Sequence, residues 1–579
     1  MLMLAPVPLF TLPPSSASSS PLPPLVVTPP LPAMVNSVST PQAQAKWLDA
    51  IARMRLMASS SAADLDQIQD DITTGVSLPL LSQPPPVIFS NTPAVNETAS
   101  AVRARLADYM DFGAVEELPP DTTPPHGIQP LHVIIKEGKK PRLVIDLSRN
   151  LNQFLEYRHF TYSKVDDAVA LASPGCWFGK LDLSNCFLSF PLHPDAIRFF
   201  YFRFDGRLYR FVRMPFGLST APLVCTQLLS VPAWEMQQRG CRFIRYLDDF
   251  LFIASSAEAL RDILQTAQEV FASFGLLVNS DKTEGPVQRI SFLGIQIDSI
   301  EQTTACTPAR VHELLQLLAT LGSKSTVRRK DVESLIGKLS FAAQVLPGAR
   351  PFMRHMLDAI HPCAKRSTPV RINECFREDV SFWLSNLTNW NGKQRWRAAQ
   401  SAPIVLATDA SLSGFGFHIV EVPPHIDATR WPIELQTASG FYGSYHQTHA
   451  DLHASHRQIA WCELLAILAA ARTYSSQLRD NYVLFLVDNS TDVAIVNRQS
   501  TKSPRLGKLL RCLYKLALEF NFSIRAAHIA GVDNSLADFL SRPELHHNDP
   551  LTSAQAVPAV RDRLRLCSAV CSSHFLPQP

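Results

Sequence analysis

Two adjacent carboxylates, Asp248 and Asp249, stand inside an otherwise apolar stretch of the chain. The segments on either side, residues 243–247 and 250–253, are rich in aromatic and aliphatic side chains. Because ionised carboxylates are costly to bury without partners, a sequence that keeps two of them here needs something to neutralise them. A divalent cation would do so, and the pair therefore indicates metal chemistry. An Asp pair at a hairpin tip can also serve local hydrogen bonding alone, so the pattern needs support from elsewhere in the chain.

A third carboxylate, Asp182, lies upstream of the pair, near the end of a predicted strand at residues 177–183. Between Asp182 and the pair, alternating apolar residues around Asp205-Gly206 predict a β-hairpin. Residues 213–222 then predict a tight turn that leads into an apolar helix.

A long helix is predicted directly after the Asp pair. Ser255 and Glu258 have the spacing of a capping box, and apolar residues at helical spacing follow as far as Gly275. The order strand, helix, hairpin, helix, strand predicts an α+β palm.

Four more acidic residues occupy predicted elements in residues 401–545. They are Asp409 at the centre of a strand, Glu463 on an apolar helix, Asp488 directly after a strand, and Asp538 on a short final helix. His528 lies ten residues before Asp538. Each acid taken alone has a structural explanation, such as a turn cap or a helix start. Together they indicate a second site.

Composition divides the chain. Its length of 579 residues predicts about three to five domains, and a hydrophobic fraction of 46% is typical of globular proteins. Residues 1–100 are dominated by Pro, Ser, Ala and Thr, which predicts a mostly disordered leader. Within it, Trp47, Ile51 and Met54 have helical spacing and predict one short helix.

Charge and cysteine content exclude several classes of protein. The net charge is only +3, although cations gather at residues 136–149 and 203–213. The first residues lack the basic start of a secretory signal, and no apolar run is long enough to span a bilayer, so an intracellular protein, cytoplasmic or nuclear, is expected. The eleven cysteines show no framework spacing, which predicts free thiols. A metal knuckle at Cys567, Cys571 and His574 would lack a fourth ligand.

Three segments taken together resemble the reverse transcriptases of retroelements. Residues 180–187 (KLDLSNCF) are similar to the family's first carboxylate motif, residues 214–222 (MPFGLSTAP) to its template-gripping motif, and residues 246–249 (YLDD) to its metal hairpin. Several motifs in the family's order are far more specific than any one of them. The resemblance covers essentially the whole fingers and palm and implies a DNA polymerase.

The resemblance implies two-metal catalysis by the first three carboxylates. In-line attack of a primer hydroxyl on a nucleotide α-phosphate uses two divalent ions about 3.5 to 4 Å apart. By the family's pattern, Asp182 and Asp248 bridge both Mg²⁺ ions, and Asp249 contributes more weakly or through water. Mn²⁺ is expected to substitute for Mg²⁺.

The resemblance also implies contacts with substrate. Lys136 and Arg142 resemble the fingers cations that grip the incoming triphosphate, although either is otherwise an ordinary exposed cation. Phe187 matches the bulky residue that excludes a 2′-hydroxyl, which implies deoxynucleoside triphosphates, with a core aromatic as the alternative. The remaining predicted substrate-binding residues are Phe216 and Gly217 of the template-gripping motif, Tyr246 of the metal hairpin, and Lys282, which matches a palm lysine proposed to protonate the pyrophosphate.

Two further features concern the polymerase half. Phe216 departs from the retroviral pattern, which has Gln there, and resembles gypsy-like and DIRS-like elements. Residues 292–294 resemble the primer grip. Beyond them, two apolar helical faces with a basic edge between them predict a thumb that holds duplex by its phosphates, although a simple helical linker fits the same pattern.

Residues 401–545 resemble ribonuclease H throughout. The resemblance implies that Asp409, Glu463, Asp488 and Asp538 hold two metal ions that hydrolyse the RNA strand of a hybrid. It also implies that His528 assists proton transfer or product release. Asn489 and Ser490 are expected to contact the sugars of the hybrid.

The sequence therefore predicts an α+β multidomain enzyme, with a right-hand polymerase followed by a ribonuclease H-like α/β domain. The expected parts are a leader at 1–100, fingers and a ferredoxin-like palm at 101–305, a helical thumb or connection at 306–400, the ribonuclease H-like domain at 401–545, and a tail at 546–579. Expected partners are an RNA template, a DNA primer and the RNA–DNA hybrid, with no membrane. Oligomeric state is left open.

The element type is predicted from segments that look most like DIRS-type retrotransposons, such as residues 459–466 and 335–340. A fragment of a gypsy-like or pararetroviral polyprotein is the alternative. A decayed or domesticated copy that binds nucleic acid without turnover is another, but all seven carboxylates are present.

Overall fold

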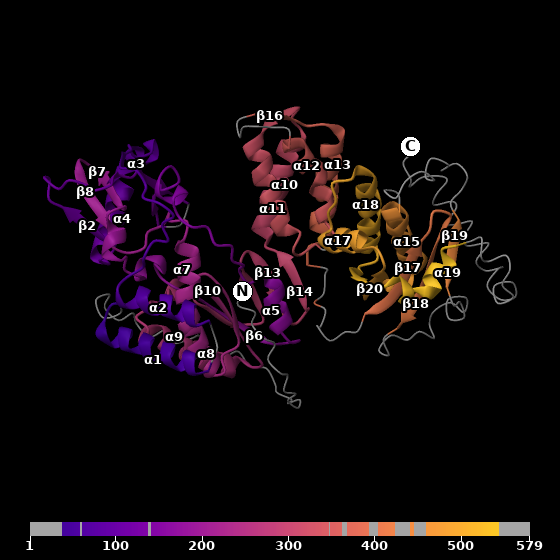
Figure 1. Cartoon of the computed structure of the whole chain (residues 1–579), viewed down its shortest axis with the longest axis horizontal. Helices are drawn as coiled ribbons and strands as arrows, with labels where there is room; N and C mark the ends of the chain where they lie inside the picture. The colour runs from indigo at the N-terminus through magenta and orange to yellow at the C-terminus, as the bar shows by residue number, and fades with distance from the viewer. Residues whose placement is uncertain are drawn as a thin grey trace. The chain divides into compact units, whose positions relative to one another are not determined.

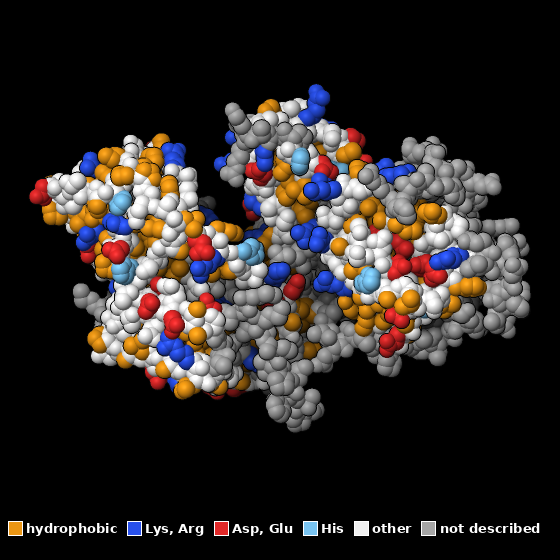
Figure 2. Space-filling view, viewed as in Figure 1, with side chains coloured by type: hydrophobic (Ala, Val, Ile, Leu, Met, Phe, Trp, Pro, Cys, Tyr) orange, Lys and Arg blue, Asp and Glu red, His pale blue; other side chains and the backbone are white. Residues whose placement is uncertain are grey.

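A computed structural model describes residues 37–57, 61–136, 140–346, 348–361, 368–392, 396, 403–422, 440–444 and 459–542 of the chain (Figure 1). It divides into two compact units, Met1–Phe292 and Leu293–Pro579. On the face that Figure 2 shows, apolar, basic and acidic side chains are interspersed. Among the described residues, no helix has both the length and the apolar character needed to cross a bilayer. None of the described cysteines forms a disulfide, as predicted.

The centre of the first unit is a four-stranded antiparallel sheet with the strand order β11-β6-β10-β9. Its strands are β6 (Trp177–Asp182), β9 (Phe243–Tyr246), β10 (Asp249–Ala254) and β11 (Glu284–Val287). Helix α9 (Ala257–Ser273) covers β6 and β10 so closely that a Cβ on Gly179 would lie 2.9 Å from a methyl of Leu264. With α7 and α8 between β6 and β9, this is the βαββαβ order of a ferredoxin-like palm.

Helix α9 begins one residue later than its capping box predicts. Ser256 is the N-cap, and its hydroxyl accepts the Ala259 N–H, so the predicted pair Ser255 and Glu258 does not form the box. The helix ends at Ser273, two residues before the predicted stop at Gly275, whose left-handed backbone follows the last turn.

The fingers contain smaller sheets. Strands β2 (Val115–Leu118), β8 (Arg207–Phe211) and β7 (Tyr201–Phe204) form an antiparallel sheet, and the predicted hairpin turn at Asp205-Gly206 joins β7 to β8 with both residues at positive φ. Strands β4 (Leu131–Ile134) and β5 (Arg142–Ile145) form a separate antiparallel pair. The other elements of this unit are β1 (Val87–Ile88), α3 (Pro93–Glu97), α4 (Ala99–Asp111), β3 (Gly127–Ile128), α5 (Val165–Leu171), α6 (Pro194–Ile197), α7 (Ala221–Leu228), α8 (Ser230–Gln238) and β12 (Arg289–Phe292).

The prediction of a disordered leader over residues 1–100 is wrong for its described part. Helices α1 (Pro41–Leu56) and α2 (Ala62–Thr73) pack on each other, and α1 also contacts α8 and α9. Trp47 is fully buried, its ring centroid lies 5.0 Å from that of Phe274, and its Nε1 donates to the Phe274 carbonyl over 3.0 Å. The composition of the segment is poor in core residues on average, but the few that it has are placed on one buried face. Residues 1–36 lie outside the described part.

Ion pairs reinforce this attachment. The buried carboxylate of Glu235 on α8 accepts hydrogen bonds from Lys46 and Arg53 of α1 and from Arg239, and these hydrogen bonds hold its pKa below the usual value against the effect of burial. Because the carboxylate is paired on several sides, its burial does not leave an uncompensated charge.

The second unit begins with a mainly helical part. Its elements are β13 (Ile295–Asp298), β14 (Thr303–Cys306), α10 (Pro308–Gly322), β15 (Thr326–Arg328), α11 (Arg329–Ala342), α12 (Arg354–Ile360), β16 (Pro369–Arg371) and α13 (Glu374–Trp390). Both apolar helical faces predicted for this part are formed, by α10 and α11. Two cations of the predicted basic edge pair locally, Arg328 with Asp331 and Arg329 with Glu333. Its function as a thumb stays a prediction.

A five-stranded mixed sheet follows, with the order β19-β18-β17-β20-β21. Its strands are β17 (Ile404–Ala410), β18 (Gly414–Glu421), β19 (Phe441–Ser444), β20 (Tyr482–Val487) and β21 (Ser523–His528). The first three pair antiparallel, whereas β20 and β21 run parallel to β17. The helices of this part are α15 (Ile459–Thr473), α16 (Ser475–Leu478), α17 (Ser490–Arg498), α18 (Pro504–Glu519) and α19 (Ser535–Leu540). The predicted fold class, a multidomain α+β protein with a mixed α/β part after the palm, is confirmed.

Trp47 tests whether the N-terminal helices belong to the core of the first unit. We expect Trp47→Ala to lower the free energy of unfolding by about 3–5 kcal/mol, because it removes a fully buried indole and its hydrogen bond. Urea unfolding of the full chain, followed by circular dichroism, measures this. Leu56→Ala is the control, since Leu56 lies on the same helix and is 87% exposed. Equal effects of the two substitutions would show that α1 is not part of the core.

Candidate functional site

The palm sheet brings the first three carboxylates together. In the pairing of β10 with β6, Asp249 lies directly opposite Asp182. Asp248 occupies the turn between β9 and β10, and its carbonyl accepts the Leu183 N–H over 3.1 Å. The preceding Leu247 has a φ of +54°, which is strained for a bulky residue and marks this turn as a constrained one. Strand register, rather than sequence proximity, therefore places Asp182 beside the pair.

Burial and mutual repulsion raise the pKa values of Asp248 and Asp249. The pKa of Asp248 is raised by burial and then by the charge of Asp182, and that of Asp249 is raised by burial and by both neighbours to about 7. Lys282 opposes this effect, because its Nζ lies 2.8 Å from Oδ2 of Asp182. The site therefore has an excess of negative charge that a cation would relieve.

The other residues predicted to bind nucleotide lie in two groups. Arg142 on β5 places its guanidinium 4.7 Å from the centre of the Phe216 ring, and the Phe187 ring lies 5.4 Å from the Phe216 ring. Tyr246 instead contacts Tyr162, with the ring centres 4.6 Å apart and the ring planes inclined by 37°. Tyr162 is a neighbour that sequence reasoning missed, because nothing local relates it to the metal hairpin.

Gly217 and Lys136 complete the predicted set. Gly217 has a φ of +110°, and a Cβ there would lie 1.8 Å from the Ile145 carbonyl oxygen, so this position requires glycine for the close approach of the turn to β5. Lys136 is exposed beyond the end of β4 and shares no hydrogen bond, ion pair or ring contact with the other predicted site residues. The structure gives Lys136 no special position.

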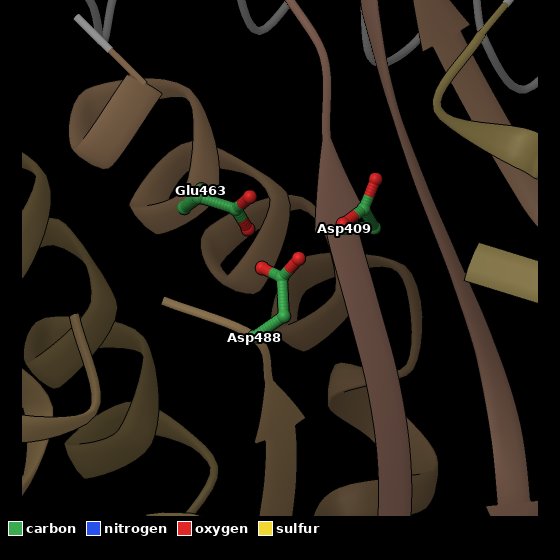
Figure 3. A group of neighbouring side chains, drawn as sticks. All are labelled: Asp409, Glu463 and Asp488. Carbon is green, nitrogen blue, oxygen red and sulfur yellow. The ribbon is translucent and has the colours of Figure 1, made fainter. Parts of the chain in front are cut away.

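In the second unit, sheet register also aligns two acids. Strands β17 and β20 are parallel and pair Ala407 with Leu486, so Asp409 and Asp488, each two residues further on, reach the same level of the sheet. Glu463 projects from α15, which packs on β17. Oxygens of Asp409, Glu463 and Asp488 all lie within 4.8 Å of one another, and Figure 3 shows the three carboxylates directed toward a common space.

Burial and mutual repulsion raise the pKa values of Glu463 and Asp409 in this second cluster. The pKa of Glu463 is raised to about 10 by burial and by the charges of Asp409 and Asp488. The pKa of Asp409 is raised to about 6, by burial first and then by Asp488 and Asp538. Glu463 accepts one weak bond, from the Ala410 N–H over 3.3 Å, and its second oxygen has no hydrogen-bond partner in the described part of the chain.

Asp538 and His528 lie at the margin of this cluster. Asp538 on α19 pairs with Arg542 and is close enough to raise the pKa of Asp409, but it stands outside the compact group of three. His528 ends β21, where it pairs with Val487, the residue before Asp488. The roles proposed for Asp538 and His528 by the resemblance stay predictions.

Asp492 is an acidic residue that sequence reasoning missed. It lies on α17, is fully buried, and neither of its oxygens has a hydrogen-bond partner among the described residues. Burial and then the charge of Asp488 raise its pKa to about 8. The available signal was an acid among the apolar residues that follow Asp488.

The second cluster fits a hard divalent cation. Its donors are carboxylate oxygens alone, the set that Mg²⁺ and Mn²⁺ prefer, and the unpartnered oxygen of Glu463 is available as a ligand. Asp182, Asp248 and Asp249 would hold ions in the palm. Asp409, Glu463 and Asp488 would hold them in the second unit, with Asp538 nearby.

Comparison with known proteins agrees with the palm assignment. Residues 131–297 match the family described as "Reverse transcriptase (RNA-dependent DNA polymerase)", so this part of the chain is a reverse transcriptase domain. The match spans Arg142, Phe187, Phe216 and the palm carboxylates.

Similar curated proteins include viral polyproteins. The "Putative enzymatic polyprotein" of Cassava vein mosaic virus is 22% identical over 70% of this chain and 58% of its own length. The "Enzymatic polyprotein" of Cauliflower mosaic virus is 22% identical over 70% of this chain and 56% of its own. "Protein P" of Duck hepatitis B virus is 26% identical over 48% of this chain and 32% of its own. The chain thus matches between about a third and three-fifths of the length of these relatives.

Among solved structures, the foamy viral protease-reverse transcriptase dRH in complex with double-stranded DNA aligns with a TM-score of 0.49 and 15% identity, covering 87% of this chain and 84% of that one. The curated relatives named above are viral proteins. They do not test the DIRS-type assignment, which stays a prediction.

Glu463 provides a test of the raised pKa values and of metal binding in this cluster. An acid whose folded-state pKa lies above its unfolded value binds more protons when folded, so its contribution makes the metal-free protein less stable as pH rises from about 4.5 toward 10. We therefore expect Glu463→Gln to raise the melting temperature of the metal-free protein at pH 8, by about 4 °C. It should also reduce the further gain that Mg²⁺ or Mn²⁺ gives the wild type. Thermal unfolding with chelator or metal measures both.

Glu519→Gln serves as the matched control, because Glu519 is exposed on α18 and its loss should change neither value. A metal-free Glu463→Gln protein that melts below the wild type at pH 8 would contradict this account of the cluster.

Proposed function

We propose that the chain is an RNA-directed DNA polymerase with ribonuclease H activity, which copies retroelement RNA into DNA and degrades the RNA strand of the hybrid. The observation that carries the polymerase part is the register that sets Asp182 opposite Asp249, inside a domain that matches the reverse transcriptase family. The nuclease part is supported by the compact group of Asp409, Glu463 and Asp488 on a mixed sheet. Proposed substrates are an RNA template, a DNA primer, deoxynucleoside triphosphates and the RNA–DNA hybrid.

In the palm, the residues of the chain orient the primer end and the nucleotide. When bound, two Mg²⁺ ions activate the attacking oxygen and stabilise the leaving one. Asp182, Asp248 and Asp249 hold them at the end of the sheet. Arg142 binds the triphosphate, and Phe187 excludes nucleotides that carry a 2′-hydroxyl. Lys282, which already contacts Asp182, protonates the departing pyrophosphate.

In the second unit, Asp409, Glu463, Asp488 and Asp538 hold a second pair of Mg²⁺ ions. His528, whose strand position adjoins Asp488, serves proton transfer or product release. The element type we propose is DIRS-like. The alternative is a fragment of a gypsy-like or pararetroviral polyprotein, and the viral relatives are compatible with it.

Separate substitutions in the two clusters test the proposal. We expect Asp248→Asn to reduce primer extension on an RNA template at least about 1000-fold and to leave cleavage of a labelled RNA–DNA hybrid unchanged, because only the palm cluster loses a ligand. Asp488→Asn should do the reverse. Primer-extension and hybrid-cleavage assays on the full chain measure both activities.

Asp205→Asn and Asp480→Asn are matched controls, since both carboxylates are exposed and lie in turns outside the clusters. If each cluster variant keeps the activity assigned to its cluster, the site assignment is wrong. If the wild type binds the hybrid but neither extends nor cleaves, the chain is a nucleic-acid-binding relic.

A further inference from the structure

The Phe216 ring contacts two side chains that come from distant parts of the chain. The Arg142 guanidinium of β5 is 4.7 Å from the ring centre. The Phe187 ring is 5.4 Å away and inclined by 55°. Phe187 begins a short 3₁₀ helix five residues after Asp182. The three side chains form a continuous contact from the fingers to the palm.

The backbone fixes the position of the Phe216 ring. The Ile145 N–H donates to the Phe216 carbonyl over 3.0 Å, which attaches the turn directly to the strand that carries Arg142. Gly217 allows this approach, since any Cβ there would overlap the Ile145 carbonyl. Asn152 holds the same turn by donating to the Gly217 carbonyl over 2.9 Å and accepting the Ser219 N–H over 3.0 Å. These backbone contacts fix the turn that carries Phe216 against the strand that carries Arg142.

The charge of Arg142 remains available to a ligand. Its side chain is exposed, and within the described residues it has no ion pair or hydrogen bond, only the aromatic ring beneath it. Burial and the charge of Asp182 raise the pKa of Asp248, and the charge of Arg142 opposes part of that rise. A long exposed Arg side chain samples many rotamers in water, and an aromatic face beneath the guanidinium restricts them without neutralising the charge.

We propose that Phe216 is a positioning residue. Its ring holds the Arg142 guanidinium over the nucleotide site and packs against the Phe187 ring. Triphosphate binding and discrimination between sugars therefore both depend on this one aromatic side chain. This inference rests on the proposed polymerase function and names the determinant of nucleotide affinity and selectivity within it. A Gln at this position would offer hydrogen bonds in place of the aromatic face. The phenyl ring instead provides the π surface for the cation and an apolar contact for Phe187.

Single-nucleotide incorporation on an RNA template tests the inference, with kcat and KM measured for dTTP and for UTP. We expect Phe216→Leu, which keeps apolar bulk and removes the ring, to raise KM for dTTP about tenfold with kcat changed less than about threefold. The preference for dTTP over UTP should fall about tenfold. Phe216→Tyr should restore KM and preference. Phe216→Met removes the ring with a different shape and should behave like Phe216→Leu.

A double variant separates positioning from simple packing. If the ring acts through Arg142, the variant with both Arg142→Gln and Phe216→Leu should have a KM no higher than that of Arg142→Gln alone. Phe112→Leu is the matched control, because Phe112 lies under Arg213 at 5.5 Å in the same unit and outside the nucleotide site. It should leave KM and preference unchanged.

The possible results are distinguishable. Independent effects of the two substitutions on KM, a change confined to kcat, or a KM change that follows melting temperature rather than loss of the ring would overturn the inference. A wild type that extends primers while Phe216→Leu matches it in KM and preference would also overturn it, and would leave the polymerase function intact. A wild type that extends no primer would refute the proposed function itself.

Discussion

Holding like-charged carboxylates close together, largely out of water, is the constraint on which the rest of this structure depends. Neither cluster assembles from neighbours in sequence alone. In the palm, the pairing of β6 with β10 sets Asp182 opposite Asp249, and in the second unit the pairing of β17 with β20 levels Asp409 with Asp488. A sheet suits this purpose because its hydrogen bonds fix register to a single residue, and a slip by one would turn every side chain to the opposite face.

The repulsion in each cluster is offset by apolar packing behind it. Strand β10 is buried over most of its length against α9, and α1 adds a further layer through Trp47. The helices that pack on the palm sheet therefore oppose the separation of strands that carry mutually repelling charges. The N-terminal segment, which composition alone assigns to disorder, is part of this support.

The two clusters differ in how deeply their side chains are buried, and this difference affects the pKa values of their carboxyls. The second is the more buried, so the pKa of Glu463 rises to about 10, whereas in the palm the pKa of Asp249 rises to about 7. The palm also has protein cations nearby, Lys282 on Asp182 and Arg142 close to Asp248. Among the described residues, the second cluster has Arg542 at its margin, on Asp538. Bound protons or a bound cation would balance its remaining charge.

The sequence by itself determined the local elements and the residue types at their ends. Periodicity and turn residues predicted the Asp205-Gly206 hairpin, the long helix that stops just before Gly275, and the strands and helices on which the acids lie, because these signals act over a few residues. What the tertiary structure decided was which of these residues meet. Contacts between segments far apart in the chain bury Trp47 and Asp492. Contacts of the same kind place the Arg142 guanidinium over the Phe216 ring. The carboxyl of Asp492 has no hydrogen-bond partner among the described residues. No local pattern records such contacts, since their free energy comes from surfaces that exist only after the chain has packed.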